Sequence, residues 1–185
     1  MGLTGTIRTL TYAVTAGHCW VPGKNVDTVT HDANGEINGT FVAGAPDSEN
    51  VVGAAMGYGL LEINPFQVAV SGSFDRYSLE SIDTNPQVGQ QVCKLGARTG
   101  LSCGTISRIG DNYFLIDGMH SDHGDSGGIV FRELPNGHAV FVGTVNGFLE
   151  TQRETVIAQS ASNLLGQLDA FAAGKGDTFH FQAGS

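Results

Sequence analysis

Positive charge is scarce in this sequence. Its 185 residues include 9 lysines and arginines against 18 aspartates and glutamates, a formal net charge of −9 at pH 7. A protein that binds nucleic-acid phosphates needs a basic surface that displaces counterions, and an anionic membrane surface attracts basic residues in the same way. The composition therefore argues against nucleic acid and against membranes as binding partners.

Long apolar runs and a leader sequence are missing as well. No stretch approaches the roughly 20 apolar residues that a membrane-spanning helix needs. Residues 1–5 have neither the basic nor the apolar part of a signal peptide, so none is visible. A chain of 185 residues fits one domain that is large enough to bury a core of its own.

Cysteine is rare, and its count of three is odd. Cys93 and Cys103 stand close together, with turn-forming glycines between them, and a local disulfide could close this loop. The alternative from spacing alone is two buried free thiols. Cys19 is left over, which indicates either a reactive thiol or a partner outside this chain.

Helix-forming patterns are sparse, and glycine, at 27 residues, is abundant. Short runs rich in branched and aromatic residues, each bounded by Gly, Pro, Asn or Asp, predict strands. These runs are 7–15, 51–55, 59–63, 66–71, 91–95, 104–109, 113–116, 128–131 and 139–145. Asn136-Gly137 predicts a tight hairpin turn, because both residues tolerate a positive φ.

One segment near the end has a helical period. Ser162 can cap it, an apolar stripe runs from Leu164 to Phe171, and Gly174 can end it. We therefore expect an all-β domain with a C-terminal helix over about 162–173 and a loose tail over 175–185.

Two segments carry the residue types of nucleophilic catalysis, Thr15-Ala16-Gly17-His18-Cys19 and Gly124-Asp125-Ser126-Gly127-Gly128. A nucleophilic serine needs a base to take its proton and backbone N–H groups to hold the oxyanion. Glycines around Ser126 allow a tight turn whose amides can converge on one point. An isolated histidine or Gly-Ser-Gly run means little, but both in this order within an all-β chain are highly specific.

These two segments make the chain resemble the chymotrypsin-like serine proteases, and most of all their bacterial branch of streptogrisins and α-lytic protease. The resemblance covers roughly residues 5–172. It implies two six-stranded antiparallel β-barrels, the first over about 1–85 and the second over about 86–158, with the active site between them. It also implies that His18 is the general base, that Ser126 is the nucleophile, and that Gly124 and Ser126 supply the oxyanion hole.

The segment 92–106 also matches the family, where it is a loop closed by a disulfide, so the resemblance implies a Cys93–Cys103 bond. It further implies that Lys94 is buried against Asp125, in place of the family's usual arginine. A specificity pocket would be bordered by the segments 120–123 and 144–147, with a third wall near 157–158. The candidate pocket residues are His120, Asp122, His123, Val145, Asn146 and Gly147.

Two histidines and an aspartate at the pocket rim could bind a metal in principle. Because no fourth ligand is evident, polar loop residues beside a pocket are the better explanation. We expect neither a metal nor another cofactor.

The family's third catalytic residue does not have its counterpart in the sequence. The family places an aspartate before a Tyr-Gly strand start, and Gly57 stands at that position here. Upstream, Asp47 could replace it through a rearranged loop, whereas Glu62 downstream should point away from the cleft by strand parity. Without the carboxylate, His18 loses the group that fixes its tautomer and stabilises its charged form.

The N-terminal part is also shorter than in the family. The first strand looks absent or shortened, together with the cysteine that pairs with the counterpart of Cys19. An incomplete first barrel exposes a strand edge.

The sequence therefore predicts a serine endopeptidase that is impaired because Gly57 replaces the triad aspartate. The alternative is an inactive pseudoprotease that binds peptides or proteins, and an esterase-like acyl transferase would share the same site. We expect a monomer that acts on a peptide or protein substrate in a secreted or extracytoplasmic location.

Overall fold

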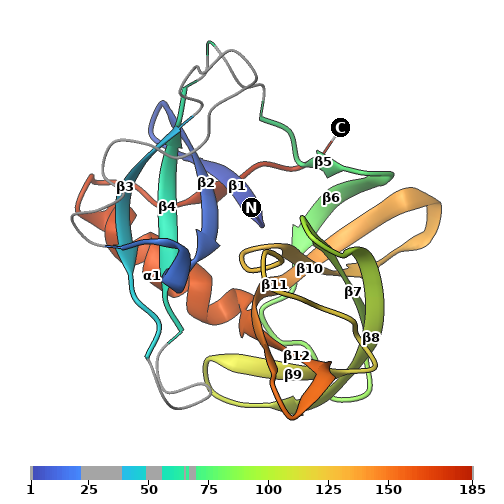
Figure 1. The fold of residues 1–185 in the computed structure, drawn as a ribbon. Helices are drawn as coiled ribbons and strands as arrows, with labels where there is room; N and C mark the ends of the chain where they lie inside the picture. Colours follow the sequence, from blue (N-terminus) through green and yellow to red (C-terminus); the bar gives the residue numbers. More distant parts are fainter. Residues whose placement is uncertain (1, 22–38, 49–55, 65, 67–69, 185) are drawn as a thin grey trace.

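The computed structural model describes residues 2–21, 39–48, 56–64, 66 and 70–184. Within them, two β-sheets lie side by side and a helix packs behind the first sheet (Figure 1). One core cluster contains residues of both sheets and of the helix, among them Tyr12, Phe131 and Leu164. The two halves are therefore joined by shared apolar packing rather than by a linker alone.

The first sheet has the strand order β13-β1-β2-β4-β3, and every pair is antiparallel. Its strands are β1 (Leu3–Ile7), β2 (Leu10–Ala16), β3 (Gly39–Ala45), β4 (Tyr58–Ile63) and β13 (His180–Phe181). The run 7–15, predicted as one strand, is divided by a turn at Arg8, whose φ is 53°. The predicted strand 51–55 and half of 66–71 lie outside the described residues.

The second sheet closes into a barrel. Strands β7 to β12 follow the order β10-β7-β8-β9-β12-β11, and a further antiparallel β10–β11 pairing closes the six-stranded ring. The strands are β7 (Gln91–Gly96), β8 (Gly100–Ile109), β9 (Tyr113–Asp117), β10 (Ile129–Glu133), β11 (His138–Leu149) and β12 (Gln152–Ser160). Branched and aromatic side chains fill its interior, as the alternating runs predicted.

The short strands β5 (Ser73–Phe74) and β6 (Tyr77–Ile82) extend this second sheet, because β6 pairs in parallel with β11. The expected boundary near residue 85 therefore differs from the strand pairing, which assigns these strands to the second sheet. Between β10 and β11, the short 3-10 turn η2 (Pro135–Gly137) has φ of 63° at Asn136 and 79° at Gly137. This is the positive-φ turn that the Asn-Gly pair predicted.

Helix α1 (Ala161–Ala173) follows β12 directly. Its cap is Ser160, whose extended backbone lets the hydroxyl accept a hydrogen bond from the Asn163 N–H at 3.3 Å. The prediction of Ser162 as the cap is wrong, because Ser162 lies within the first turn. Gly174 follows the last helical residue, as expected.

The segment after the helix is ordered against both sheets, so the expectation of a loose tail is wrong. In β13, Phe181 pairs with Gly5 of β1, and Phe179 is buried in the shared core. The Gln182 N–H donates to Thr4 in the first sheet, and the Gly184 N–H donates to Leu79 in the second. The segment 180–184 therefore covers an edge of β1 that would otherwise be open.

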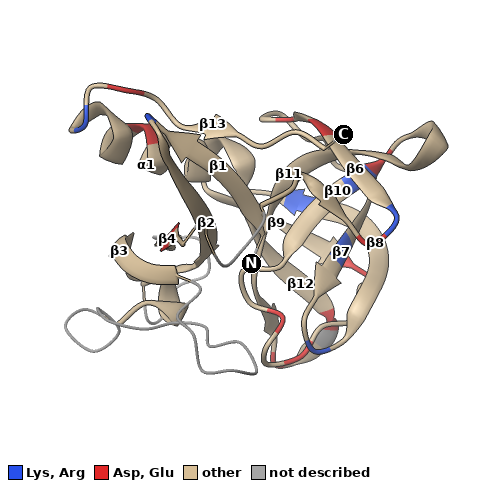
Figure 2. Ribbon diagram, turned by 90° about the horizontal axis from the view of Figure 1, so that it is seen from above, with Lys and Arg blue, Asp and Glu red and all other residues tan. Residues whose placement is uncertain are grey.

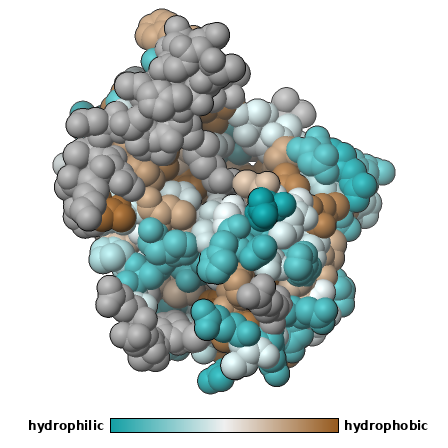
Figure 3. Space-filling model, in the orientation of Figure 1, coloured by the Kyte–Doolittle hydropathy of each residue, from teal (hydrophilic) through white to brown (hydrophobic). Residues whose placement is uncertain are grey.

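The described surface is mixed in polarity. On the face shown in Figure 3, hydrophilic and hydrophobic side chains alternate, and Figure 2 shows lysine and arginine in small separate patches. Among the described residues, no helix has the length and apolar character needed to cross a membrane.

Candidate active site

Ser126 lies in a tight turn between β9 and β10. Gly127 has a φ of 77°, and a Cβ there would lie 2.1 Å from Thr15 Oγ1, so a side chain would collide with the first sheet. The Gly127 N–H donates to the carbonyl of Val145 at 2.7 Å, which fixes the turn against β11. Glycine at this position therefore lets the turn that carries Ser126 lie directly against β2.

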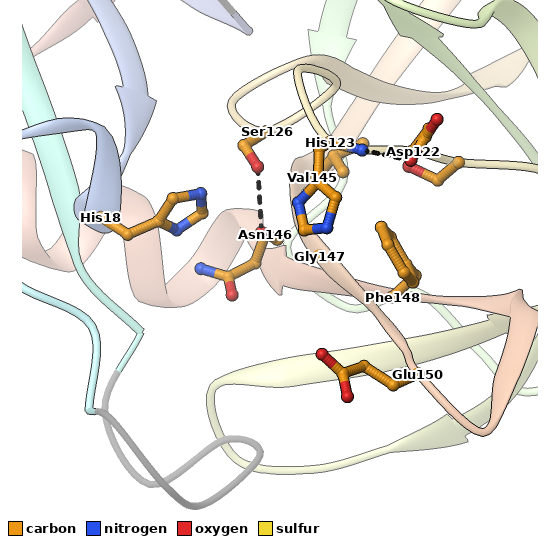
Figure 4. Close-up of a pocket in the computed structure, with 10 residues that line it drawn as sticks. His18, Asp122, His123, Ser126, Val145, Asn146, Gly147, Phe148 and Glu150 are labelled. Atoms are coloured by element: carbon orange, nitrogen blue, oxygen red, sulfur yellow. Dashed lines mark hydrogen bonds between the residues drawn. The ribbon is translucent and has the colours of Figure 1, made fainter.

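His18 comes from the end of β2, in the single 3-10 turn η1 (Gly17–Cys19). Its ring and Ser126 line the same cavity and face each other across it (Figure 4). In this structure Ser126 Oγ donates to the carbonyl oxygen of Asn146 at 3.3 Å. Hydrogen bonds between a catalytic serine and its base often form fully only when substrate is bound.

A carboxylate does reach His18, and it belongs to Asp47. Its Oδ2 atom lies 2.7 Å from His18 Nδ1 and also accepts the backbone N–H of His18 at 3.1 Å. Asp47 lies just after β3, on the connection that leads towards β4. The expectation that His18 lacks a carboxylate partner is therefore wrong, and the rearranged-loop alternative describes the geometry.

Gly57 has a different task from the one its sequence position indicated. Its backbone N–H donates to Asp47 Oδ1 at 2.6 Å. A Cβ at Gly57 would lie 2.0 Å from the carbonyl oxygen of Ala45 and 2.6 Å from the carbonyl carbon of Pro46. The chain before Asp47 thus fills the space that a side chain at residue 57 would need, so residue 57 leaves no gap beside His18.

The Asp47–His18 contact changes the titration of both groups. The hydrogen bond to Asp47, with a smaller contribution from Cys19, raises the pKa of His18 to about 10, although partial burial acts in the opposite direction. Burial would raise the pKa of Asp47, but hydrogen bonds from His18 and Gly57 outweigh it and lower that pKa. The pair therefore favours a charged carboxylate and a readily protonated imidazole.

Cys19 lies next to this pair and takes no part in the disulfide. Burial would raise the pKa of its thiol, but hydrogen bonds with His18 and Thr15 outweigh burial and lower the pKa. The thiol is thus the second titratable group in contact with His18.

Two backbone amides near Ser126 have no acceptor among the described residues. They are the N–H groups of Gly124 and of Ser126, and Gly124 has a φ of 101°. Free donors of this kind are what an oxyanion hole requires. Both are the residues that the resemblance implied for this role.

The carboxylate of Asp125, the residue before Ser126, is held by many hydrogen bonds. Its side chain and that of Lys94 are fully buried, and Lys94 Nζ lies 3.0 Å from Asp125 Oδ2. Five further donors surround the carboxylate: the N–H groups of residues 98, 99 and 122 and the hydroxyls of Thr99 and Ser121. Burial alone would raise the pKa of Asp125, but these bonds, led by those from Thr99, hold it far below its usual range.

A cavity of about 230 Å³ opens beside Ser126. Five of the six candidate pocket residues line it, namely Asp122, His123, Val145, Asn146 and Gly147. His120 is exposed and is not among the lining residues, and the third wall expected at 157–158 is not among them either. The lining of the cavity on this side begins at the next residue, Ser121.

Sequence reasoning missed two residues at this cavity, Phe148 and Glu150. Phe148 packs edge-on against the ring of His123, with 5.3 Å between the ring centroids (Figure 4). Both follow the motif at 144–147 on the same strand and hairpin, so extending that wall towards the next turn would have included them.

The disulfide expected from the family resemblance is present between Cys93 and Cys103. These residues lie opposite each other on β7 and β8. In the described part of the chain, no group of three His, Cys, Asp or Glu side chains is arranged to hold a metal ion.

A scan against models of known protein families found no match. Two curated relatives, both called uncharacterized protein (MT1863 and Rv1815) and both from Mycobacterium tuberculosis, are 41% identical over 59 residues. That match spans 31% of this chain and 27% of each relative.

The solved structures cover far more of the chain. A glutamic-acid-specific serine protease described as using a histidine triad in substrate binding matches with a TM-score of 0.68 at 21% identity, over 96% of this chain and 91% of that chain. Protease A of Thermobifida fusca gives 0.67 at 20%, over 100% and 91%. Cellulomonas bogoriensis chymotrypsin gives 0.55 at 19%, over 96% and 97%.

The chain has the chymotrypsin fold. In this instance of the chymotrypsin fold, His18 and Asp47 come from the first sheet and Ser126 from the second. The site therefore lies where the two halves of the chymotrypsin fold meet.

Proposed function

We propose that this protein is a serine endopeptidase in which Ser126 is the nucleophile, His18 the general base and Asp47 the third member of the triad. The observation that carries the proposal is the 2.7 Å contact between Asp47 Oδ2 and His18 Nδ1, beside the cavity that His18 shares with Ser126. This geometry supports a complete triad with Asp47 as its acid, whereas the glycine at position 57 had indicated a triad without an acid.

The chemistry follows from the positions of these groups. His18 Nε2 takes the proton of Ser126 as Oγ bonds to the carbonyl carbon of the substrate, and Asp47 stabilises the imidazolium that forms. The negative oxygen is bound by the amides of Gly124 and Ser126. The imidazolium then gives its proton to the leaving amine as the C–N bond breaks. In the second half, His18 takes a proton from water as the water oxygen bonds to the acyl carbon, and this proton passes to Ser126 Oγ as the C–Oγ bond breaks and the acid leaves.

The remaining features agree with a peptide substrate outside the reducing cytoplasm. The cavity of about 230 Å³ opens beside Ser126, and residues of β11 line it. A disulfide such as Cys93–Cys103 persists in oxidising compartments. We therefore propose a secreted or extracytoplasmic protein that acts on peptides or proteins.

A fluorophosphonate probe tests the proposal, because it phosphonylates a serine only when that serine is activated. We expect one label per chain at Ser126, located by peptide mass spectrometry, and no label in Ser126→Ala. The control is Ser162→Ala on the exposed face of α1, which should be labelled like the wild type. Thr99→Val is unsuitable as a control because its hydroxyl lies beneath the turn that carries Ser126. A wild-type protein that folds but neither reacts with the probe nor hydrolyses casein would favour the peptide-binding pseudoprotease.

A further inference from the structure

The peptide group between Met56 and Gly57 is held from both sides. Its N–H, which belongs to Gly57, donates to Asp47 Oδ1 at 2.6 Å. Its carbonyl oxygen, which belongs to Met56, accepts the side-chain amides of Gln167 at 2.7 Å and of Gln159 at 3.3 Å. One planar peptide unit therefore connects these two carboxamides with the carboxylate of the candidate triad acid.

This peptide group precedes the strand ladder. Strand β4 begins at Tyr58, where its pairing with β2 and with β3 also begins. Met56 is buried, and a buried backbone carbonyl that no neighbouring strand reaches needs another donor. Helix α1 and the end of β12 supply it, because Gln167 lies in the helix and Gln159 is the last residue but one of the strand.

The two carboxamides also hold each other. Gln159 is buried, and its Nε2 atom lies 3.0 Å from Gln167 Oε1 and 2.8 Å from Asn163 Oδ1. Asn163 in turn donates to the side chain of Asn112 at 3.0 Å. Gln167 therefore has its oxygen fixed by one donor and its amide directed at the Met56 carbonyl. Hydrogen bonds in such a series polarise one another, so a bond accepted by the carbonyl of a peptide group strengthens its N–H as a donor.

The bond from Gly57 matters because of where Asp47 lies. Asp47 follows β3 in a connection, so no strand pairing fixes the direction of its side chain. Its Oδ2 atom contacts the backbone N–H and the Nδ1 atom of His18, and its Oδ1 atom accepts the Gly57 N–H. With both oxygens bonded, the carboxylate cannot turn about its Cβ–Cγ bond without losing a hydrogen bond. The Gly57 N–H therefore determines how Oδ2 faces the imidazole.

We propose that Gln167 is a positioning residue for the triad acid, with Gln159 as its support. Its carboxamide fixes the peptide group 56–57, and the Gly57 N–H of that group keeps the Asp47 carboxylate in line with the imidazole. The inference rests on the proposed function. It gives a part in catalysis to helix α1, which packs behind the first sheet and contributes no residue to the lining of the cavity (Figure 1).

Gln167→Met tests the proposal, because it keeps the unbranched shape of the side chain and removes the amide. We expect kcat to fall about 3- to 30-fold while KM stays within about twofold, because the alignment of the triad acid matters in the transition state and not in substrate binding. Gln167→Glu, which places an oxygen against the Met56 carbonyl in place of the donor, should act in the same direction. Gln91→Met, which removes a carboxamide bonded to Thr105 on the second barrel, should leave kcat unchanged.

A double variant shows whether the effect passes through Asp47. In the Asp47→Asn background, Gln167→Met should change kcat by less than about twofold, because the group that Gln167 positions has already lost its charge. The same fold-loss in both backgrounds would mean that Gln167 acts by another route, and it would overturn the inference. Circular dichroism and the melting temperature establish that each variant is folded.

NMR of the His18 ring needs no substrate, so it separates this inference from the proposed function. The signals of the ring nitrogens and of the Nδ1 proton should shift in Gln167→Met and stay in place in Gln91→Met. An inactive wild type in which they do so would remove the function and leave the positioning role. An active wild type with the same kcat and the same His18 signals in folded Gln167→Met would overturn the inference. A change in KM alone would also overturn it, because substrate binding would then be the step that Gln167 affects.

Discussion

Gly57 donates its backbone N–H to the carboxylate of Asp47, a residue that precedes it by ten positions in the chain. The main chain at Gly57 thus holds the carboxylate that contacts His18. Its missing side chain makes room for the segment that brings Asp47 to His18. The glycine at residue 57 and the contact between Asp47 and His18 therefore belong to the same local arrangement of the chain.

Replacing Gly57 by aspartate should therefore damage the protein instead of improving it. A Cβ at this position would lie 2.0 Å from the Ala45 carbonyl, and overpacking of this kind typically costs about 1–3 kcal/mol. The added carboxylate would also face Asp47. We expect a lower melting temperature and a lower kcat in Gly57→Asp, and a lower melting temperature in Gly57→Ala.

Gly166 provides the matched control, because nothing lies within 4 Å of a Cβ built there and it lies in α1. Gly166→Ala should be neutral or stabilising by about 0.5–1 kcal/mol. Higher turnover in Gly57→Asp than in the wild type would show that Asp47 does not serve His18.

Asp47→Asn should reduce kcat by about 10⁴-fold, the loss typical of an exchange of the triad acid for its amide. The amide can no longer stabilise the imidazolium of His18, and it favours the wrong tautomer. Steady-state hydrolysis of a peptide ester measures the effect. The control is Glu62→Gln in β4, whose carboxylate lies on the first sheet without a bond to His18, and which should keep the wild-type kcat. If Glu62→Gln fell as far as Asp47→Asn, the assignment of Asp47 would be wrong.

The raised pKa of His18 sets a pH dependence. The base must be neutral to accept the proton of Ser126, and Asp47 raises its pKa above the ordinary 6.5, to about 10. Activity should therefore be low in acid, and kcat/KM should rise with pH to a midpoint above 6.5. In Asp47→Asn the residual activity should have its midpoint shifted downwards, because the carboxylate that favours the charged ring is gone. A wild-type midpoint at or below that of Asp47→Asn would contradict the contact.

Lys94→Met should destabilise the protein strongly. Both side chains of the Lys94–Asp125 pair are fully buried, and loss of one member of such a pair typically costs about 3–5 kcal/mol. Because Asp125 directly precedes Ser126 in the same turn, we expect labelling of Ser126 by the fluorophosphonate probe to fall as well. Denaturant unfolding and labelling measure the two effects. Lys175→Met, at an exposed position after α1, should change neither, and a fully stable Lys94→Met would show that the pair is dispensable.

Much of the site could be predicted from short segments. The glycines around Ser126 and the motif that ends in His18 and Cys19 are local, and local sequence determines the turns in which they lie. The disulfide and the Lys94–Asp125 pair followed because the whole loop 92–106 matched one known arrangement.

The expectations that the structure contradicts all depend on the path of the chain. Asp47 reaches His18 only because the connection after β3 crosses over Gly57, and no local pattern in residues 45–57 encodes that crossing. The resemblance implied a pocket wall over residues 120–123, but only residues 121–123 line the cavity, and His120 does not. A loose tail is the general expectation for the residues after a last helix, yet β13 is held by its pairing with β1, which is distant in the sequence.

That last pairing has a consequence for how the protein is made. Phe181 must pair with Gly5, and the Gly184 N–H must bond to the Leu79 carbonyl, before the edge of β1 is covered and this segment links the two sheets. The edge of β1 therefore stays uncovered until residues 180–184 have been synthesised and have paired with it. Contacts between such distant parts of a chain form slowly. The edge of β1 is thus expected to be covered late in folding, after the strands of both sheets have formed.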